Sequence, residues 1–186
     1  MDASEARIIW GDVESTGTEA FTGDSLLEVA FLITDGELNI LDENGYQAVV
    51  RYSPEEVQEL RSHTSEYVLN MHEATDLWSK LPEGKPLEQI DHEALAYIKQ
   101  FVPEQRSARF AGNSITLDRN FMNRNLPGTV SHIHYRSFDV STVAGLAQMW
   151  GGEDIVYQKK TLHSAFSDIT ESIEELRYLR TKAFKF

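Results

Sequence analysis

Two carboxylates stand two residues apart at the end of an apolar run near the start of the chain. Asp12 and Glu14 follow Ile8, Ile9 and Trp10 in the stretch IIWGDVES. Side chains alternate along a β-strand, so residues two apart point to the same face. Both acids could bind one cation from a single strand end. A solvated strand end remains the ordinary explanation of such a pair when it stands alone.

Three more residues with the same potential follow later in the chain. Asp118 comes after GNSITL, at the first turn of a predicted helix, where a carboxylate also suits the helix dipole. Asp168 lies early in the last predicted helix, beside its apolar stripe, where an unpaired carboxylate would be costly. His163 precedes it by five residues; a lone His is more often an ordinary surface residue.

The order of these residues is more specific than any one of them. Four carboxylates meeting at one point would repel one another unless cations lay between them. We therefore expect a site for two divalent cations of the Mg²⁺ or Mn²⁺ type, which prefer oxygen ligands. His163 would suit a general base there, because a histidine titrates near neutrality.

The elements that must position these residues begin with closely spaced strands. Strands are predicted over residues 7–13 and 26–34, and the sheet is expected to continue through 37–41 and 46–52. Turn signals at Asp35-Gly36 and at 42–45 separate them. Such short connections favour an antiparallel meander.

Helices and strands alternate in the rest of the chain. Ser53-Pro54 is typical of a helix start, and helical spacing predicts helices over 86–102, from 117 to near Pro127, over 142–150 and over about 164–182. Short strands are expected at 109–111 and 135–139. With no repeat or linker, residues 1–186 are predicted to form a single α/β domain, a mixed central sheet covered by helices.

Composition narrows the class of protein. The net charge of −13 argues against binding long DNA or RNA on a basic surface, because such binding neutralises phosphates with Lys and Arg. The absence of cysteine fits a reducing cytoplasm, the expected location. The sequence shows neither a membrane-length apolar run nor a signal-peptide pattern.

Motifs along nearly the whole chain resemble one known family. The segments WGDVESTG, MHEATDL, AGNSITLDRNF, HYRSFDVSTVAGLAQMW and HSAFSDITESIEELRYLR are similar to oligoribonuclease, within the DEDDh 3′→5′ exonucleases. HYR followed by DVST favours oligoribonuclease over its proofreading relatives. The resemblance implies a ribonuclease H-like fold with a five-stranded mixed sheet.

The resemblance also implies an activity and a mechanism. Asp12, Glu14, Asp118 and Asp168 would bind two metal ions, and His163 would be the general base. The implied reaction releases 5′-mononucleotides from RNAs of about two to five nucleotides, including linear dinucleotides, which carry few phosphates. Two alternatives stay open: an exonuclease for longer single-stranded RNA or DNA or for DNA oligomers, and a nucleotide-binding module without activity.

Substrate contacts are implied residue by residue. The resemblance assigns the 5′-phosphate to the GNS, HYR and DVS segments, with Tyr and Arg of HYR supplied by the partner in a homodimer. These and the remaining substrate residues are Asn113, Ser114, Tyr135, Arg136, Ser141, His72, Tyr67 and Thr18. Ser141 could also serve as the N-cap of the following helix.

Two of these positions depart from the family pattern. Thr18 stands where relatives have a Leu that wedges against a base, and Tyr67 stands where many have Trp. Both positions concern contacts to the bases, and therefore the preferred substrate length, while the residues of the reaction match the family.

Overall fold

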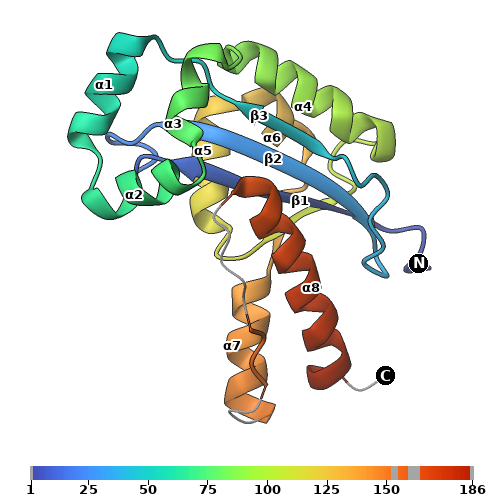
Figure 1. Cartoon of the computed structure of the whole chain (residues 1–186). Helices are drawn as coiled ribbons and strands as arrows, with labels where there is room; N and C mark the ends of the chain where they lie inside the picture. The colour runs from blue at the N-terminus through green and yellow to red at the C-terminus, as the bar shows by residue number, and fades with distance from the viewer. Residues whose placement is uncertain (1, 152–154, 159–163, 185–186) are drawn as a thin grey trace.

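A five-stranded mixed sheet with strand order β3-β2-β1-β4-β5 forms the centre of the molecule (Figure 1). The computed structural model describes residues 2–151, 155–158 and 164–184. The strands are β1 (Arg7–Ser15), β2 (Leu26–Asp35), β3 (Tyr46–Val49), β4 (Arg109–Gly112) and β5 (Ser137–Asp139). This confirms the predicted fold class.

The first three strands form the predicted antiparallel meander, and β4 and β5 run parallel to β1. The expectation of sheet structure at 37–41 was wrong: after the Asp35 turn only one isolated bridge forms, between Thr34 and Ile40. Asp35 explains this, because its carboxylate accepts hydrogen bonds from the backbone N–H groups of Glu37 and Asn39 and holds the chain in a turn.

Helices cover both faces of the sheet. They are α1 (Pro54–His63), α2 (Glu66–Ala74), α3 (Leu77–Lys80), η1 (Leu81–Glu83), α4 (Leu87–Phe101), α5 (Thr116–Asn125), α6 (Pro127–His132), α7 (Val140–Gly151) and α8 (Ala165–Ala183). In Figure 1, α7 and α8 lie below the sheet, while α4 and α6 lie on its other side. Ser53 forms the predicted helix start, as a complete capping box with Glu56.

Alternation along β1 divides its side chains between two cores. Ile9 and Val13 pack in the cluster on the α4 and α5 side, whereas Ile8 and Trp10 pack with Ile169 of α8. Period-two alternation then places Asp12 and Glu14 on the same face as Trp10, the face that α8 covers. The first strand therefore aims both acids at the start of the last helix.

Two predicted boundaries need correction near the end of the sheet. The strand expected over 135–139 is limited to β5, and the helix expected to begin at Thr142 begins at Val140. Ser141 is therefore inside α7 and is not its N-cap. Asp139 precedes the helix, and its carboxylate accepts a hydrogen bond from the backbone N–H of Ser141 at 2.9 Å.

Because β1, β4 and β5 are parallel, the segments that follow them lie together at the carboxyl-terminal ends of these strands. The three strands β1, β4 and β5 end at Ser15, Gly112 and Asp139 respectively. Carboxyl ends of parallel strands share an edge, so the candidate residues of all three segments gather there. Within the described ranges, no helix is long and apolar enough to cross a bilayer.

Candidate active site

Asp12 and Glu14 occupy the carboxyl-terminal half of β1, between β2 and β4. The preceding Gly11 has no room for a side chain: a Cβ there would lie 2.4 Å from the ring of Phe110. This close packing holds the strand firmly against the core. Directly after Glu14, the pairing with β2 shifts register, which ends the regular ladder beside the two acids.

Asp168 joins these two acids from α8. Ser164 precedes the helix, and the backbone N–H of Asp168 donates to the Ser164 carbonyl in the first turn. One carboxylate oxygen from each of Asp12, Glu14 and Asp168 lies within 4.8 Å of the others. Three oxygens at such spacing suit a divalent cation, which takes hard oxygen ligands.

Asp118 approaches the same strand from α5 on the other face. Its side chain is buried and accepts a hydrogen bond from the backbone N–H of Val13, 3.0 Å away. This bond holds the Asp118 carboxylate against the backbone of Val13, the residue between Asp12 and Glu14. Asp118 also lies close enough to Asp12 to affect the ionisation of that carboxyl.

The carboxyls of this cluster resist losing their protons together. Burial, then repulsion from Asp118, Glu14 and Asp168, raises the pKa of Asp12 well above its ordinary value. Burial, followed by the charge of Asp168, raises the pKa of Glu14 to about 8. Burial raises the pKa of Asp118 to about 7, although the Val13 hydrogen bond opposes the shift. A bound cation removes this repulsion, so the donor set fits divalent metal.

Glu28 is a fifth acid beside the cluster, which the sequence analysis missed. It lies directly opposite Glu14 in the β1–β2 ladder, is buried, and contributes to the raised pKa values of Asp12 and Glu14. Its carboxylate accepts hydrogen bonds from Gln47 Nε2 and from the backbone N–H of Ala165. A single acid within the apolar run LLEVAF was the available signal.

The residues expected near the scissile end of a substrate differ in exposure. The His72 side chain is 0% exposed, with Nε2 2.9 Å from the Ser15 carbonyl and Nδ1 3.8 Å from Glu14. Tyr67, on the same helix α2, is 71% exposed, and Thr18 is exposed in the loop after β1. In this structure His72 therefore contacts β1, whereas Tyr67 and Thr18 are open to solvent.

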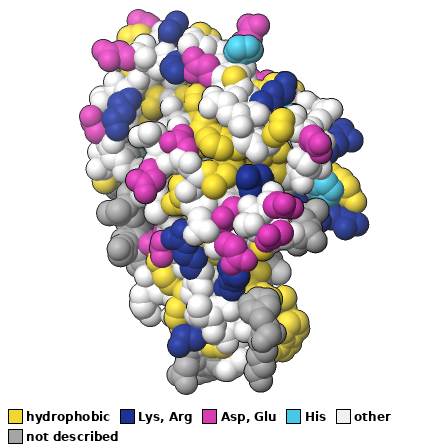
Figure 2. Space-filling model, turned by 90° about the vertical axis from the view of Figure 1, so that its right-hand side faces the viewer, with side chains coloured by type: hydrophobic (Ala, Val, Ile, Leu, Met, Phe, Trp, Pro, Cys, Tyr) yellow, Lys and Arg dark blue, Asp and Glu magenta, His cyan; other side chains and the backbone are white. Residues whose placement is uncertain are grey.

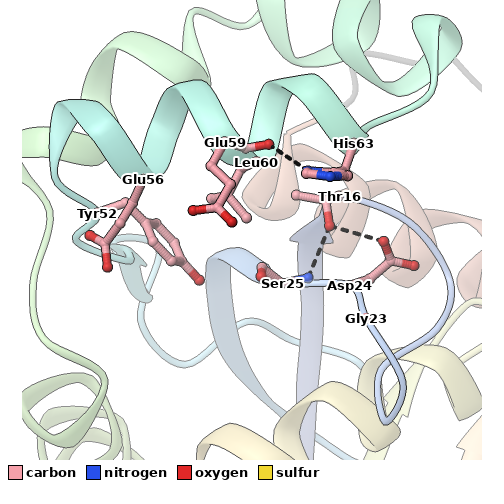
Figure 3. A pocket seen from close by; sticks show the side chains of 9 residues that line it. All are labelled: Thr16, Gly23, Asp24, Ser25, Tyr52, Glu56, Glu59, Leu60 and His63. Atoms are coloured by element: carbon pink, nitrogen blue, oxygen red, sulfur yellow. Dashed lines mark hydrogen bonds between the residues drawn. The ribbon is translucent and has the colours of Figure 1, made fainter.

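A hollow of about 340 Å³ lies beyond the end of β1, between the loop after it and α1 (Figure 3). The residues that line it are Thr16, Gly23, Asp24, Ser25, Tyr52, Glu56, Glu59, Leu60 and His63. Thr16 Oγ1 donates to Asp24 and accepts from the Ser25 backbone N–H, which closes the loop on itself. Three acids in this hollow disfavour an anionic ligand there.

Residues from the ends of β4 and β5 form one hydrogen-bonded group. The Ser114 backbone N–H donates to Ser141 Oγ at 2.9 Å and to Asp139 at 3.1 Å. Ser141 Oγ in turn donates to Asn113 Oδ1 at 3.0 Å. Ser114 has a φ of 51°, a left-handed turn that aims its backbone N–H at the β5 end. The three predicted substrate residues Asn113, Ser114 and Ser141 are thus brought together.

Tyr135 and Arg136 lie just before β5, away from this group. Both are exposed, and the Arg136 guanidinium lies 5.4 Å from the centre of the Tyr135 ring. The strand register places Ser137 beside Phe110, and Phe110 beside Ile9. Arg136 is therefore level with Ile8, about 13 Å along the sheet from Asp12. The remaining predicted site residue, His163, lies outside the described residues.

Comparison with known proteins identifies relatives of this chain. The family model described as Exonuclease (RNase T) matches residues 9–176. Curated relatives include the oligoribonuclease of Cutibacterium acnes, 37% identical over 93% of this chain and 84% of that protein. The oligoribonuclease of Streptomyces coelicolor is 39% identical over 96% of this chain and 87% of that protein.

Solved structures share the fold at much lower identity. Exonuclease I from Methylocaldum szegediense superposes with a TM-score of 0.69 at 15% identity, covering 95% of this chain. Exonuclease I from E. coli, solved with a 5cy-dA13 oligonucleotide, gives a TM-score of 0.67 at 14% identity. This chain spans 41% of the length of each of these two structures.

Proposed function

Since this chain belongs to the exonuclease family, and its curated relatives are oligoribonucleases, we propose that it is a 3′→5′ exoribonuclease for very short RNA. Its substrates are RNAs of about two to five nucleotides, including linear dinucleotides, and its products are 5′-mononucleotides. The carboxylate cluster of Asp12, Glu14 and Asp168 is the observation that carries this proposal.

The acids and His163 divide the reaction between them. Asp12, Glu14, Asp118 and Asp168 would hold two divalent cations, Mg²⁺ or Mn²⁺. Bound there, the cations would lower the pKa of a water molecule and offset the negative charge that develops during hydrolysis of the phosphodiester. His163 accepts the proton from the attacking water, since a histidine titrates near neutral pH.

Charge favours a short substrate. The net charge is −13, and on the face drawn in Figure 2 the Lys and Arg side chains are interspersed with Asp and Glu. Long nucleic acid gains its affinity from many phosphates neutralised by basic side chains. A dinucleotide presents so few phosphates that metal ions and single cationic side chains suffice.

Asn113, Ser114 and Ser141 hold the 5′-phosphate of the substrate together with the partner's Tyr135 and the partner's Arg136. A guanidinium suits this task because it binds phosphate through two parallel hydrogen bonds. Arg136 lies toward the amino-terminal ends of the parallel strands, about 13 Å along the strand direction from Asp12 of the same subunit. This placement supports a homodimer in which each Tyr135 and Arg136 serve the partner's site.

An exposed apolar surface on α7 and the end of α8 supports the same homodimer. Trp150 and Met149 are 77% and 76% exposed, and Phe184 is 48% exposed. Trp150 and Phe184 line a hollow of about 490 Å³ between the two helices. Large exposed apolar side chains gathered in one place are typical of protein interfaces.

Turnover of matched RNAs of two, five and twenty nucleotides tests the proposed substrate length. Cleavage is expected to be fastest on the dinucleotide and slowest on the twenty-mer. Equal or faster cleavage of the twenty-mer would favour the alternative, an exonuclease for longer single strands. A 5′-labelled ladder followed over time with Mg²⁺ and with Mn²⁺ would show whether residues leave from the 3′ end.

A further inference from the structure

Arg119 connects α5 to the segment that carries Tyr135 and Arg136. Its Nη1 donates to Ser137 Oγ at 2.9 Å, and its Nη2 donates to the His134 carbonyl at 3.0 Å. The two bonds hold both ends of the four-residue segment 134–137, which we call the arm. The residue before Arg119 is Asp118, one of the proposed metal ligands. One helix turn therefore holds both a site carboxylate and the arm.

The arm has a defined shape of its own. The His134 and Tyr135 rings stack with their centres 4.5 Å apart, and the Arg136 backbone N–H donates to His134 Nδ1 at 3.0 Å. The His134 backbone N–H donates to the Ala108 carbonyl, which ties the start of the arm to the residue before β4. Tyr135 is nevertheless 69% exposed, so the arm presents its side chains outward.

The bonding of Arg119 indicates a positioning role. The guanidinium is half-buried, so its placement carries a desolvation cost. Within the described residues, the guanidinium donates hydrogen bonds to the Ser137 hydroxyl and the His134 carbonyl, and both acceptors belong to the arm. Hydrogen bonds from a charged donor are stronger than those between neutral groups, and the planar fork of an arginine can bind two sites at fixed angles.

We propose that Arg119 is a positioning residue for the partner's substrate site: it fixes the arm so that Tyr135 and Arg136 reach the 5′-phosphate held by the other subunit. This inference rests on the proposed function of the arm. Arg119 itself touches no substrate. Its loss therefore weakens binding of a 5′-phosphorylated substrate and leaves the carboxylate site intact.

A kinetic comparison tests the effect on binding. Arg119→Ala is expected to raise the KM for a 5′-phosphorylated RNA dinucleotide about ten-fold, the order expected when two such bonds are lost. The kcat, and the kcat/KM for the same dinucleotide with a 5′-hydroxyl, are expected to stay at wild-type values. Arg119→Lys should recover only part of the effect, because lysine lacks the two-pronged geometry.

Arg51→Ala is the matched control, since Arg51 also donates to a backbone carbonyl, that of Gly84, far from the arm. Ser137→Ala is a second variant, which removes one of the two bonds and leaves Arg119 in place. It should raise the same KM by a smaller factor even if Arg119→Ala proves unstable. An unchanged KM in both variants, or an equal loss on both substrates, would overturn the proposal.

Mixed dimers separate this inference from the proposed function. Asp12→Asn subunits are expected to be inactive but to retain an intact arm. These subunits are co-expressed with Arg119→Ala subunits, and the mixed dimers are purified through two different tags. Each mixed dimer then has one working site, which combines the carboxylates of the Arg119→Ala subunit with the intact arm of the Asp12→Asn subunit. The mixed dimer should then show about half of the wild-type kcat/KM on the 5′-phosphorylated dinucleotide, compared with about one tenth for the Arg119→Ala homodimer.

A parallel mixed dimer of Asp12→Asn with Arg136→Ala tests the arm itself. Recovery in both mixed dimers supports the proposal. Recovery with Arg136→Ala but none with Arg119→Ala overturns the role of Arg119 and leaves the exchanged arm standing. No recovery with Arg136→Ala overturns the exchanged arm, and the inference with it.

Discussion

Replacing Glu14 with glutamine should stabilise the metal-free protein while abolishing its activity. Glu14 is buried beside Asp168, Glu28 and Asp118, and its pKa rises from 4.5 to about 8. At about pH 7.5 this side chain is ionised in the unfolded chain and mostly protonated in the metal-free fold. The shift corresponds to about 4 kcal/mol of lost stability, at about 1.4 kcal/mol per pKa unit.

The sign of the pH dependence follows from the direction of the shift. The folded state binds this proton more tightly than the unfolded chain, so the stability of the metal-free protein falls as the pH rises from about 5 to about 8. Glutamine carries no charge at any of these pH values. The stability gained in the Glu14→Gln variant should therefore grow over the same pH range.

Thermal unfolding in EDTA at pH 6 and pH 8 measures the effect. Up to about 4 kcal/mol corresponds to a rise in Tm of roughly 8 to 15 °C at pH 8 for a chain of this size, and to a smaller rise at pH 6. Added Mn²⁺ should raise the Tm of the wild type more than that of the variant. Glu104→Gln, in an exposed loop, is the control and should change neither value. A lower or unchanged Tm for Glu14→Gln in EDTA at pH 8 would refute the conclusion that burial and the neighbouring carboxylates raise the pKa of Glu14.

Further predictions concern the site, the core and the interface. Asp168→Asn should lower kcat at least about a thousand-fold with the fold retained by circular dichroism, since a proposed metal ligand is lost. Calorimetric affinity for Mn²⁺ should rise between pH 6 and pH 8, because protons on Glu14 (pKa about 8) and Asp118 (pKa about 7) compete with the metal. Gly11→Ala should cost about 1 to 3 kcal/mol in urea unfolding, because its Cβ would meet the Phe110 ring at 2.4 Å. Trp150→Glu should convert the proposed homodimer to monomers in light scattering; an unshifted dimer would place the interface elsewhere.

Local patterns in the sequence were sufficient to predict most of the fold. The apolar runs of β1 and β2 and the helical spacing over 87–101 predicted those elements within one or two residues at each end. Residues 37–41 were misassigned because apolar alternation competes there with the side chain of Asp35, which holds the backbone in a turn. Hydrogen bonds from a side chain to nearby backbone groups can outweigh propensity over so short a stretch.

The candidate site also has one part that the sequence determined and another part that only the tertiary structure decided. The sequence by itself determined that Asp12 and Glu14 share a face, because strand alternation is a local property. Only the tertiary structure decided that Asp168 comes within 4.8 Å of them, that Glu28 lies opposite Glu14, and that Arg119 holds the arm. These three facts depend on which strands pair and which helix packs on which face. That arrangement results from the burial of the whole core, and no short segment encodes it.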